Sequence, residues 1–152
     1  MHLELALDAA ARLAPGDAQV GYAVLLHDLG KALTPREVLP RHLEHESRGV
    51  PPLRAVCARL RAPADFAALA EVVCREHLNL HRARELRPGS MVDLIERLDG
   101  YRQPQRIDRI TLACAADKLG RAGESIDRFV YPARDLVAQA LVATLRVDAR
   151  PF

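Results

Sequence analysis

The sequence predicts an all-α domain, and three observations lead to this conclusion. Apolar residues recur three and four positions apart in most segments, which is the spacing of a buried helix face. Prolines and glycines separate these segments, and the alternating pattern of β-strands is almost absent. A chain of 152 residues with 49% hydrophobic content can bury a core of its own. We therefore expect one compact domain over residues 1–152, built from about six to eight helices.

The first two helices are predicted on either side of a proline-glycine break. The face of the first helix is formed by four residues at helical spacing: His2, Leu5, Ala9 and Leu13. Pro15 and Gly16 end this helix. Asp17 can cap the next one, because its side chain accepts hydrogen bonds from backbone N–H groups. We expect the second helix to run from about Ala18 to Lys31.

Later breaks divide the rest of the chain into helical segments. Breaks at residues 34–35 and 40 leave a short segment that carries His42 and His45. Pro51-Pro52 and Pro63 each precede a further helix, since proline is tolerated in a first turn. Ser90 with Asp93 resembles a capping box. The apolar faces of the helices that follow Pro63 are Phe66, Ala70 and Val73; Met91, Leu94, Ile95 and Leu98; Ile107, Ile110 and Cys114; and Leu136, Val137, Ala140 and Leu141.

Composition limits the classes of function. Lys and Arg total 22 against 20 for Asp and Glu, so the charge is too balanced to predict a nucleic-acid-coating protein. The three cysteines, Cys57, Cys74 and Cys114, lie among apolar neighbours and are expected to be reduced core thiols. No apolar run is long enough to span a bilayer, and the N-terminus lacks a signal-peptide pattern. We expect a soluble, cytoplasmic protein.

Polar residues on or beside the predicted buried faces are the main functional signal. These residues are His2, His27 with Asp28, His77, and Asp117. Burying an isolated carboxylate or imidazole costs several kcal/mol unless the group is paired or binds a metal ion. One shared divalent ion would remove this cost for all of them, so the pattern predicts that they converge. Gly30 would allow a ligand or a neighbouring backbone to approach closely.

Each of these residues also has an ordinary structural interpretation. A single buried histidine such as His2 or His77 can be a hydrogen-bonded core residue, and Asp117 can be a cap or an ion-pair partner. The segment with His42 and His45 is polar and flanked by prolines, so both are expected at the surface. His81 lies one turn after His77 and is expected to face solvent. Only the combined pattern favours a metal site.

The combined pattern resembles a known family. His2, His27-Asp28 within Leu-Leu-His-Asp-Leu-Gly-Lys, and Asp117 resemble the His…His-Asp…Asp signature of the HD superfamily of metal-dependent phosphohydrolases. Four longer stretches, residues 27–35, 39–42, 101–106 and 116–121, are similar to the C-terminal HD domain of bacterial CCA-adding enzymes, the multifunctional tRNA nucleotidyltransferases. This resemblance extends from His2 to about the Tyr131-Pro132 region.

The resemblance implies a metal centre with named ligands. His2, His27, Asp28 and Asp117 would hold a divalent ion, and His27 and Asp28 would form the catalytic centre. His45 and His77 would be additional ligands in enzymes with a second metal. A mixed nitrogen and oxygen site without thiolate disfavours structural zinc and permits Ni, Mn, Fe, Co, Zn or Mg.

Three cations are candidates for binding a substrate phosphate. These are Lys31, Arg41 and Arg121. A guanidinium can bind two phosphate oxygens at once, and an ammonium can neutralise phosphate charge. Each of the three is equally well explained as a solvated surface cation.

The activity implied by the resemblance is a metal-dependent phosphohydrolase. It would include 2′,3′-cyclic phosphodiesterase, 2′-nucleotidase and phosphatase reactions on nucleotides or RNA 3′ ends, including those of tRNA. Nothing matches the nucleotidyltransferase head of that family, and an HD ligand at position 2 leaves no room for one, so we do not expect this chain to add CCA. One alternative is a non-catalytic HD module that binds tRNA or forms a homodimer. Another is an HD nucleotide phosphohydrolase of different specificity.

Overall fold

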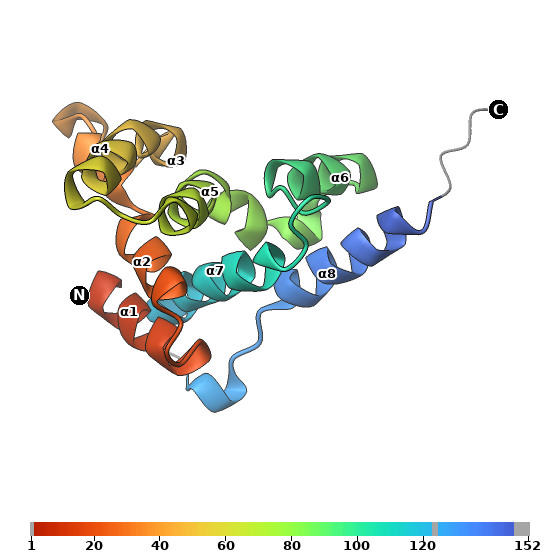
Figure 1. Cartoon of the computed structure of the whole chain (residues 1–152). Helices are drawn as coiled ribbons and strands as arrows, with labels where there is room; N and C mark the ends of the chain where they lie inside the picture. The colour runs from red at the N-terminus through yellow and green to blue at the C-terminus, as the bar shows by residue number, and fades with distance from the viewer. Residues whose placement is uncertain (1, 123–124, 148–152) are drawn as a thin grey trace.

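The computed structural model describes residues 2–122 and 125–147, and these residues form helices and connecting turns without any β-strand (Figure 1). The α-helices are α1 (His2–Leu13), α2 (Ala18–Leu26), α3 (His45–Arg48), α4 (Val50–Leu60), α5 (Ala64–His81), α6 (Pro88–Arg97), α7 (Arg106–Ala122) and α8 (Pro132–Leu145). Short 3-10 helices are η1 (Leu29–Leu33), η2 (Arg36–Val38), η3 (Ala83–Glu85) and η4 (Ile126–Arg128). The predicted all-α fold is confirmed.

The long helix α7 lies at the centre of the fold. It packs against α1, α2, α5 and α8, while α2 also packs against α5 (Figure 1). The fully buried side chains include Val20, Val24, Leu53, Leu69, Leu80, Leu94, Ile95 and Ile110. The three cysteines are buried and free of disulfides, as the sequence predicts. Burial of apolar faces against α7 therefore accounts for the placement of α1, α2, α5 and α8, while α4 packs on α5 and α6 packs on α8.

Helices α1 and α7 approach each other unusually closely at a glycine. A Cβ on Gly120 would lie 2.7 Å from the backbone nitrogen of Ala6 and 2.8 Å from its Cα. Ala6 itself is completely buried. Only glycine fits this contact without moving a backbone. The contact fixes the start of α1 beside the last turns of α7.

The second helix is shorter than predicted. Asp17 caps it as expected, and its carboxylate accepts hydrogen bonds from the backbone nitrogens of Gln19 and Val20 at 3.1 and 3.3 Å. The helix ends at Leu26 rather than near Lys31. Asp28 has φ −104° and ψ 12°, and the 3-10 helix η1 follows. The reason is tertiary: Gly30 packs directly on the backbone of His45, which a continued α-helix would not allow.

The capping box predicted at Ser90 is wrong. Helix α6 begins two residues earlier, at Pro88, and its cap residue Arg87 makes no side-chain capping hydrogen bond. Proline is favoured at the first helical position because its fixed φ is already helical. Ser90 therefore lies inside the first turn.

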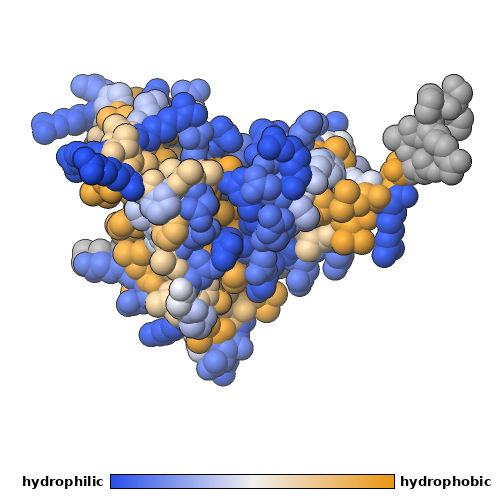
Figure 2. Space-filling view, viewed as in Figure 1, coloured by the Kyte–Doolittle hydropathy of each residue, from blue (hydrophilic) through white to orange (hydrophobic). Residues whose placement is uncertain are grey.

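The surface is mostly hydrophilic, but apolar side chains are exposed at several places among the described residues, including Leu5, Leu43 and Leu60. Figure 2 shows apolar side chains at the outer end of α8, where Val142, Leu145 and Val147 are 47%, 59% and 70% exposed. Among the described helices, none is both long and apolar enough to cross a lipid bilayer.

Replacing Asp17 by alanine is expected to lower the free energy of unfolding by about 1–2 kcal/mol, because the α2 cap is lost. The Asp17 carboxylate also pairs with Arg109 at 2.7 Å, but this pair is partly exposed and adds little. Burial raises the pKa of Asp17, and the hydrogen bonds from Arg109 and from the cap bring it below 3.8. The stabilisation by the charged Asp17 is therefore fully present above the usual pKa of an aspartate, and it is lost as the pH falls through the lowered pKa of Asp17.

Urea denaturation of Asp17→Ala at several pH values measures this effect. Asp8→Ala, at an exposed position on α1, is the matched control and should change stability little. An equal loss in the two variants would contradict the capping role.

Candidate metal centre

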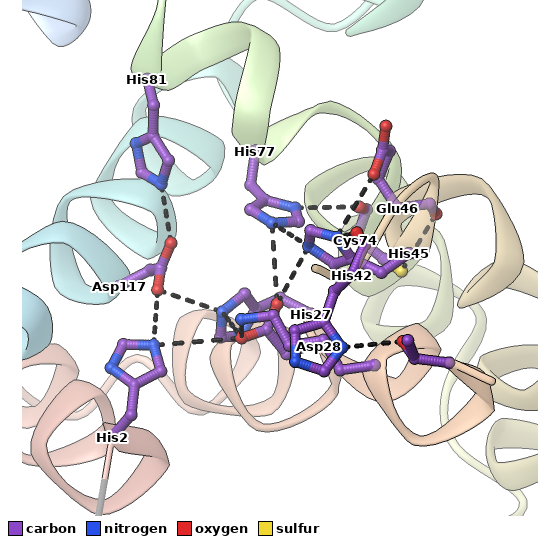
Figure 3. Close-up of polar contacts among 12 residues, drawn as sticks. His2, His27, Asp28, His42, His45, Glu46, Cys74, His77, His81 and Asp117 are labelled. Atoms are coloured by element: carbon purple, nitrogen blue, oxygen red, sulfur yellow. Dashed lines mark hydrogen bonds and ion pairs between the residues drawn. The ribbon is translucent and has the colours of Figure 1, made fainter. Parts of the chain in front are cut away.

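Three segments that are distant in sequence bring the four predicted ligands together. His2 comes from the start of α1, His27 and Asp28 directly follow the last residue of α2, and Asp117 comes from α7 (Figure 3). One ligand atom from each of these four residues lies within 4.8 Å of all the others. These four side chains therefore converge, as the sequence predicts.

The distances inside this first group are short. Nε2 of His2 lies 2.8 Å from Oδ1 of Asp117, and Nε2 of His27 lies 3.2 Å from the same oxygen. Nε2 of His27 is also 3.2 Å from Oδ2 of Asp28. Two imidazole nitrogens and two carboxylate oxygens therefore face one small volume, and this donor set suits a divalent transition metal.

A second group shares Asp28 with the first. Its other oxygen, Oδ1, lies 3.3 Å from Nε2 of His45 and 3.7 Å from Nε2 of His77. The two Nε2 atoms are 3.3 Å apart, and the three residues form a second set that could hold an ion. Each oxygen of Asp28 therefore faces a different group of histidines.

Backbone carbonyls orient three of the histidines. Nδ1 of His27 donates to the carbonyl of Val24 at 2.7 Å, and Nδ1 of His45 donates to that of His42 at 2.8 Å. Nδ1 of His77 donates to the carbonyl of Cys74 at 2.9 Å. This leaves Nε2 of each ring as the atom that faces the cluster. A ring that carries its proton on Nδ1 alone offers the Nε2 lone pair, which is the tautomer a metal ligand needs.

The cluster has a buried back and an open edge. His27, His77 and Asp117 are at most 1% exposed, whereas the side chains of Asp28 and His2 are 18% and 32% exposed. Within the described residues, Nε2 of His27 and Oδ1 of Asp28 are buried without a hydrogen-bond partner of good geometry. Buried polar atoms normally have partners, so these two atoms fit a site for a cation.

The ionisation states suit cation binding. Burial raises the pKa of Asp28, but hydrogen bonds with His27 and Lys31 outweigh it and hold that pKa well below its usual range. The pKa of Asp117 is also far below its usual range, because His27 and His81 overcome the effect of burial. Burial and the charge of His27 lower the pKa of His77 to about 4. Both carboxylates are therefore charged at neutral pH, and His77 is neutral.

His27 differs from His77. Burial lowers its pKa, but hydrogen bonds with Asp117 and Asp28 raise it to about 9. Ligation of His27 therefore requires the loss of a proton at neutral pH.

The three candidate phosphate-binding cations are placed differently. Lys31 pairs with Oδ2 of Asp28, and Arg121 donates to Oδ1 of Asp117 at 3.0 Å. Both lie at the open edge, with side chains 26% and 41% exposed. Arg41 is exposed in the segment before α3, and the described contacts do not join it to the cluster.

Two expectations about histidines are wrong. His45 was expected at the surface but is only 6% exposed, because α3 packs closely on Gly30 and on Cys74 of α5. His81 was expected to face solvent, yet its side chain is 12% exposed and its Nε2 lies 2.7 Å from Oδ2 of Asp117. The spacing of four residues from His77, which puts both on one helix face, was the available signal for His81.

Comparison with known proteins gives a consistent result. The HD domain family profile matches residues 2–122. The multifunctional CCA proteins of Xanthomonas euvesicatoria pv. vesicatoria (strain 85-10) and Xylella fastidiosa (strain M12) are 51% and 44% identical over 150 residues. That of Stenotrophomonas maltophilia (strain K279a) is 52% identical over 151 residues. Each alignment covers 99% of this chain but only 36% of the relative. No solved structure gives a significant match.

Replacing Gly30 by alanine is expected to displace His45 from the second group. The added Cβ would overlap the backbone oxygen of His45 and lie 2.7 Å from the nitrogen of Gly49. Overpacking of this kind costs about 1–3 kcal/mol, measurable by urea denaturation. Gly21→Ala on α2 is the matched control, because its Cβ would meet nothing within 4 Å. The control should gain stability, so similar behaviour of the two variants would contradict the proposed contact.

Proposed function

Because this chain belongs to the HD domain family, we propose that it is a divalent-metal-dependent phosphohydrolase that acts on 2′,3′-cyclic or 2′-phosphate ends of nucleotides or RNA. The observation that carries the proposal is the convergence of His2, His27, Asp28 and Asp117 on one volume. Two buried atoms of this group, Nε2 of His27 and Oδ1 of Asp28, have no hydrogen-bond partner of good geometry, which supports cation binding rather than a purely structural cluster.

The first group would hold one ion, and Asp28, His45 and His77 would hold a second. When bound, a divalent ion supplies Lewis acidity that polarises a phosphoryl oxygen and lowers the pKa of water. Nickel, manganese, iron, cobalt, zinc and magnesium are all compatible with imidazole and carboxylate donors. Burial raises the pKa of the nearby Cys74 thiol to about 12, so no thiolate takes part at neutral pH.

The residues of the open edge would bind the substrate. Lys31 and Arg121 lie beside Asp28 on the accessible side, where a phosphate group can reach the cluster. Their charges would offset that of the phosphate and fix its orientation. Arg41 would contribute only from a distance, through the exposed segment before α3.

The substrate class is drawn from the relatives. Their name, multifunctional CCA protein, refers to the CCA end of tRNA, so we propose RNA 3′ ends, including those of tRNA, as the natural substrate. The accessible edge of the cluster leaves His2 and Asp28 within reach of a phosphate from solvent.

A non-catalytic role in RNA binding or subunit contact is the second candidate. It is favoured by one observation: Lys31, Arg121 and His81 already pair with the two carboxylates, so the cluster is partly compensated by protein cations. Metal content separates the two candidates. A purified protein without metal, and without a gain in stability when metal is added, would favour the second.

The wild-type protein is expected to hydrolyse 2′,3′-cyclic AMP when Mn²⁺ or Ni²⁺ is added. Asp28→Asn should lower kcat by more than about 100-fold. Loss of a residue that only orients a metal ligand costs roughly 10–100-fold, and Asp28 would be a ligand itself. Phosphate release and product analysis by chromatography measure this change.

Asp93→Asn, at an exposed position on α6, is the control and should keep full activity. A folded wild-type protein that turns over no cyclic nucleotide with any of the six metals would refute the proposal. Turnover of nucleoside triphosphates alone would indicate an HD hydrolase of another specificity.

A further inference from the structure

His81 links the metal centre to a part of the chain outside the family match. Its Nε2 lies 2.7 Å from Oδ2 of Asp117, and its Nδ1 lies 2.9 Å from the hydroxyl of Tyr131 (Figure 3 shows the first contact). Tyr131 is the residue before α8, whereas the HD profile ends at residue 122. The two contacts form one chain from Tyr131 through His81 to Asp117.

The Nδ1 partner of His81 differs from that of the three carbonyl-bound histidines. His27, His45 and His77 donate from Nδ1 to backbone carbonyls, which can only accept. Nδ1 of His81 instead meets the Tyr131 hydroxyl, which can donate, while its Nε2 donates to the charged carboxylate of Asp117. In the tautomer with the proton on Nε2, Nδ1 is an acceptor and the Tyr131 hydroxyl donates to it. His81 belongs to neither group of candidate ligands and is placed to support Asp117.

Tyr131 is well suited to this role. Burial, with the charge of nearby acidic groups, holds the pKa of its hydroxyl far above the usual range, so the proton is retained. Its ring meets the ring of His81 edge-on at 5.9 Å and lies nearly parallel to that of Phe129 at 6.4 Å. These contacts fix the hydroxyl where Nδ1 of His81 can accept from it.

The contacts of Asp117 explain why such a support matters. Its Oδ1 contacts His2, His27 and Nε of Arg121, whereas Oδ2 lies 2.7 Å from Nε2 of His81. Arg121 reaches Oδ2 only at 3.5 Å. Without His81, Oδ2 would lose its one short contact among the described residues, and rotation of the carboxylate about its Cβ–Cγ bond would be less restricted.

We propose that His81 is a positioning residue for Asp117 and that Tyr131 fixes its imidazole. Tyr131, which lies beyond the residues that the HD profile matches, is then a functional part of the metal centre. This inference rests on the proposed metal binding at the first group. It concerns the affinity of the site for a divalent ion and not the reaction step itself.

The test is Mn²⁺ affinity, measured by isothermal titration calorimetry on the full chain. His81→Ala is expected to weaken Mn²⁺ binding roughly 10–100-fold, the usual range for a residue that orients a ligand. Tyr131→Phe, which removes one oxygen atom, should weaken it by about 10-fold, at the low end of that range. His81→Gln should recover part of the affinity, because its amide N–H can donate to Asp117.

Tyr101→Phe is the matched control, since Tyr101 is 36% exposed and should bind Mn²⁺ like wild type. Thermal unfolding without metal is measured for every variant. If Tyr131→Phe and His81→Gln lower only the metal-free unfolding midpoint and leave the Mn²⁺ affinity unchanged, the role is structural and the inference is overturned. If His81→Ala does not fold, these two variants still decide the matter.

Failure of the inference and failure of the proposed function are distinguishable. A wild-type protein that binds no Mn²⁺ overturns both. A wild-type protein that binds Mn²⁺ but hydrolyses no cyclic nucleotide overturns only the proposed function, and the affinities of the variants still support or overturn the role of His81.

Discussion

The carboxylate of Asp28 is the point on which the arrangement of the centre depends. One of its oxygens faces His27, and the other faces His45 and His77. A charged carboxylate beside buried imidazoles is costly unless each oxygen meets a positive or donating group. Helix α2 ends at Leu26, so His27 and Asp28 follow it. Their side chains are therefore not held about 100° apart around a helix axis, as neighbouring side chains within a helix are.

Close backbone contacts at two glycines then hold the ligands in place. Gly120 lets α1 lie against α7, which brings His2 to Asp117. Gly30 lets η1 pack on α3, which brings His45 to Asp28. Rigid placement of this kind comes from backbone packing in the core and not from the ligands alone. The centre is thus built from contacts between helices that are far apart in sequence.

Periodicity was sufficient to predict the fold, because helix faces are set by local spacing and by proline and glycine breaks. Periodicity was also sufficient to identify Asp117 as a candidate buried polar residue, because it lies on an otherwise apolar helix face. The end of α2, the burial of His45 and the contact of His81 with Asp117 were not predicted. All three depend on which backbone segments pack against each other. The spacing of apolar residues along a single helix does not contain that information. The position of the α6 start was missed for a local reason, since Pro88 begins the helix before Ser90 can cap it.

Charge balance connects the buried cluster to its open edge. The carboxylates of Asp28 and Asp117 face two cations, Lys31 and Arg121, at the accessible side. Under the proposed function, a divalent ion among the imidazoles would offset the same two negative charges. The positive charges of Lys31 and Arg121 would then no longer be balanced by the two carboxylates. A phosphate group that entered from solvent would balance them. His81 stays on the buried side of Asp117, so it can keep the carboxylate oriented while the edge cations turn to the substrate.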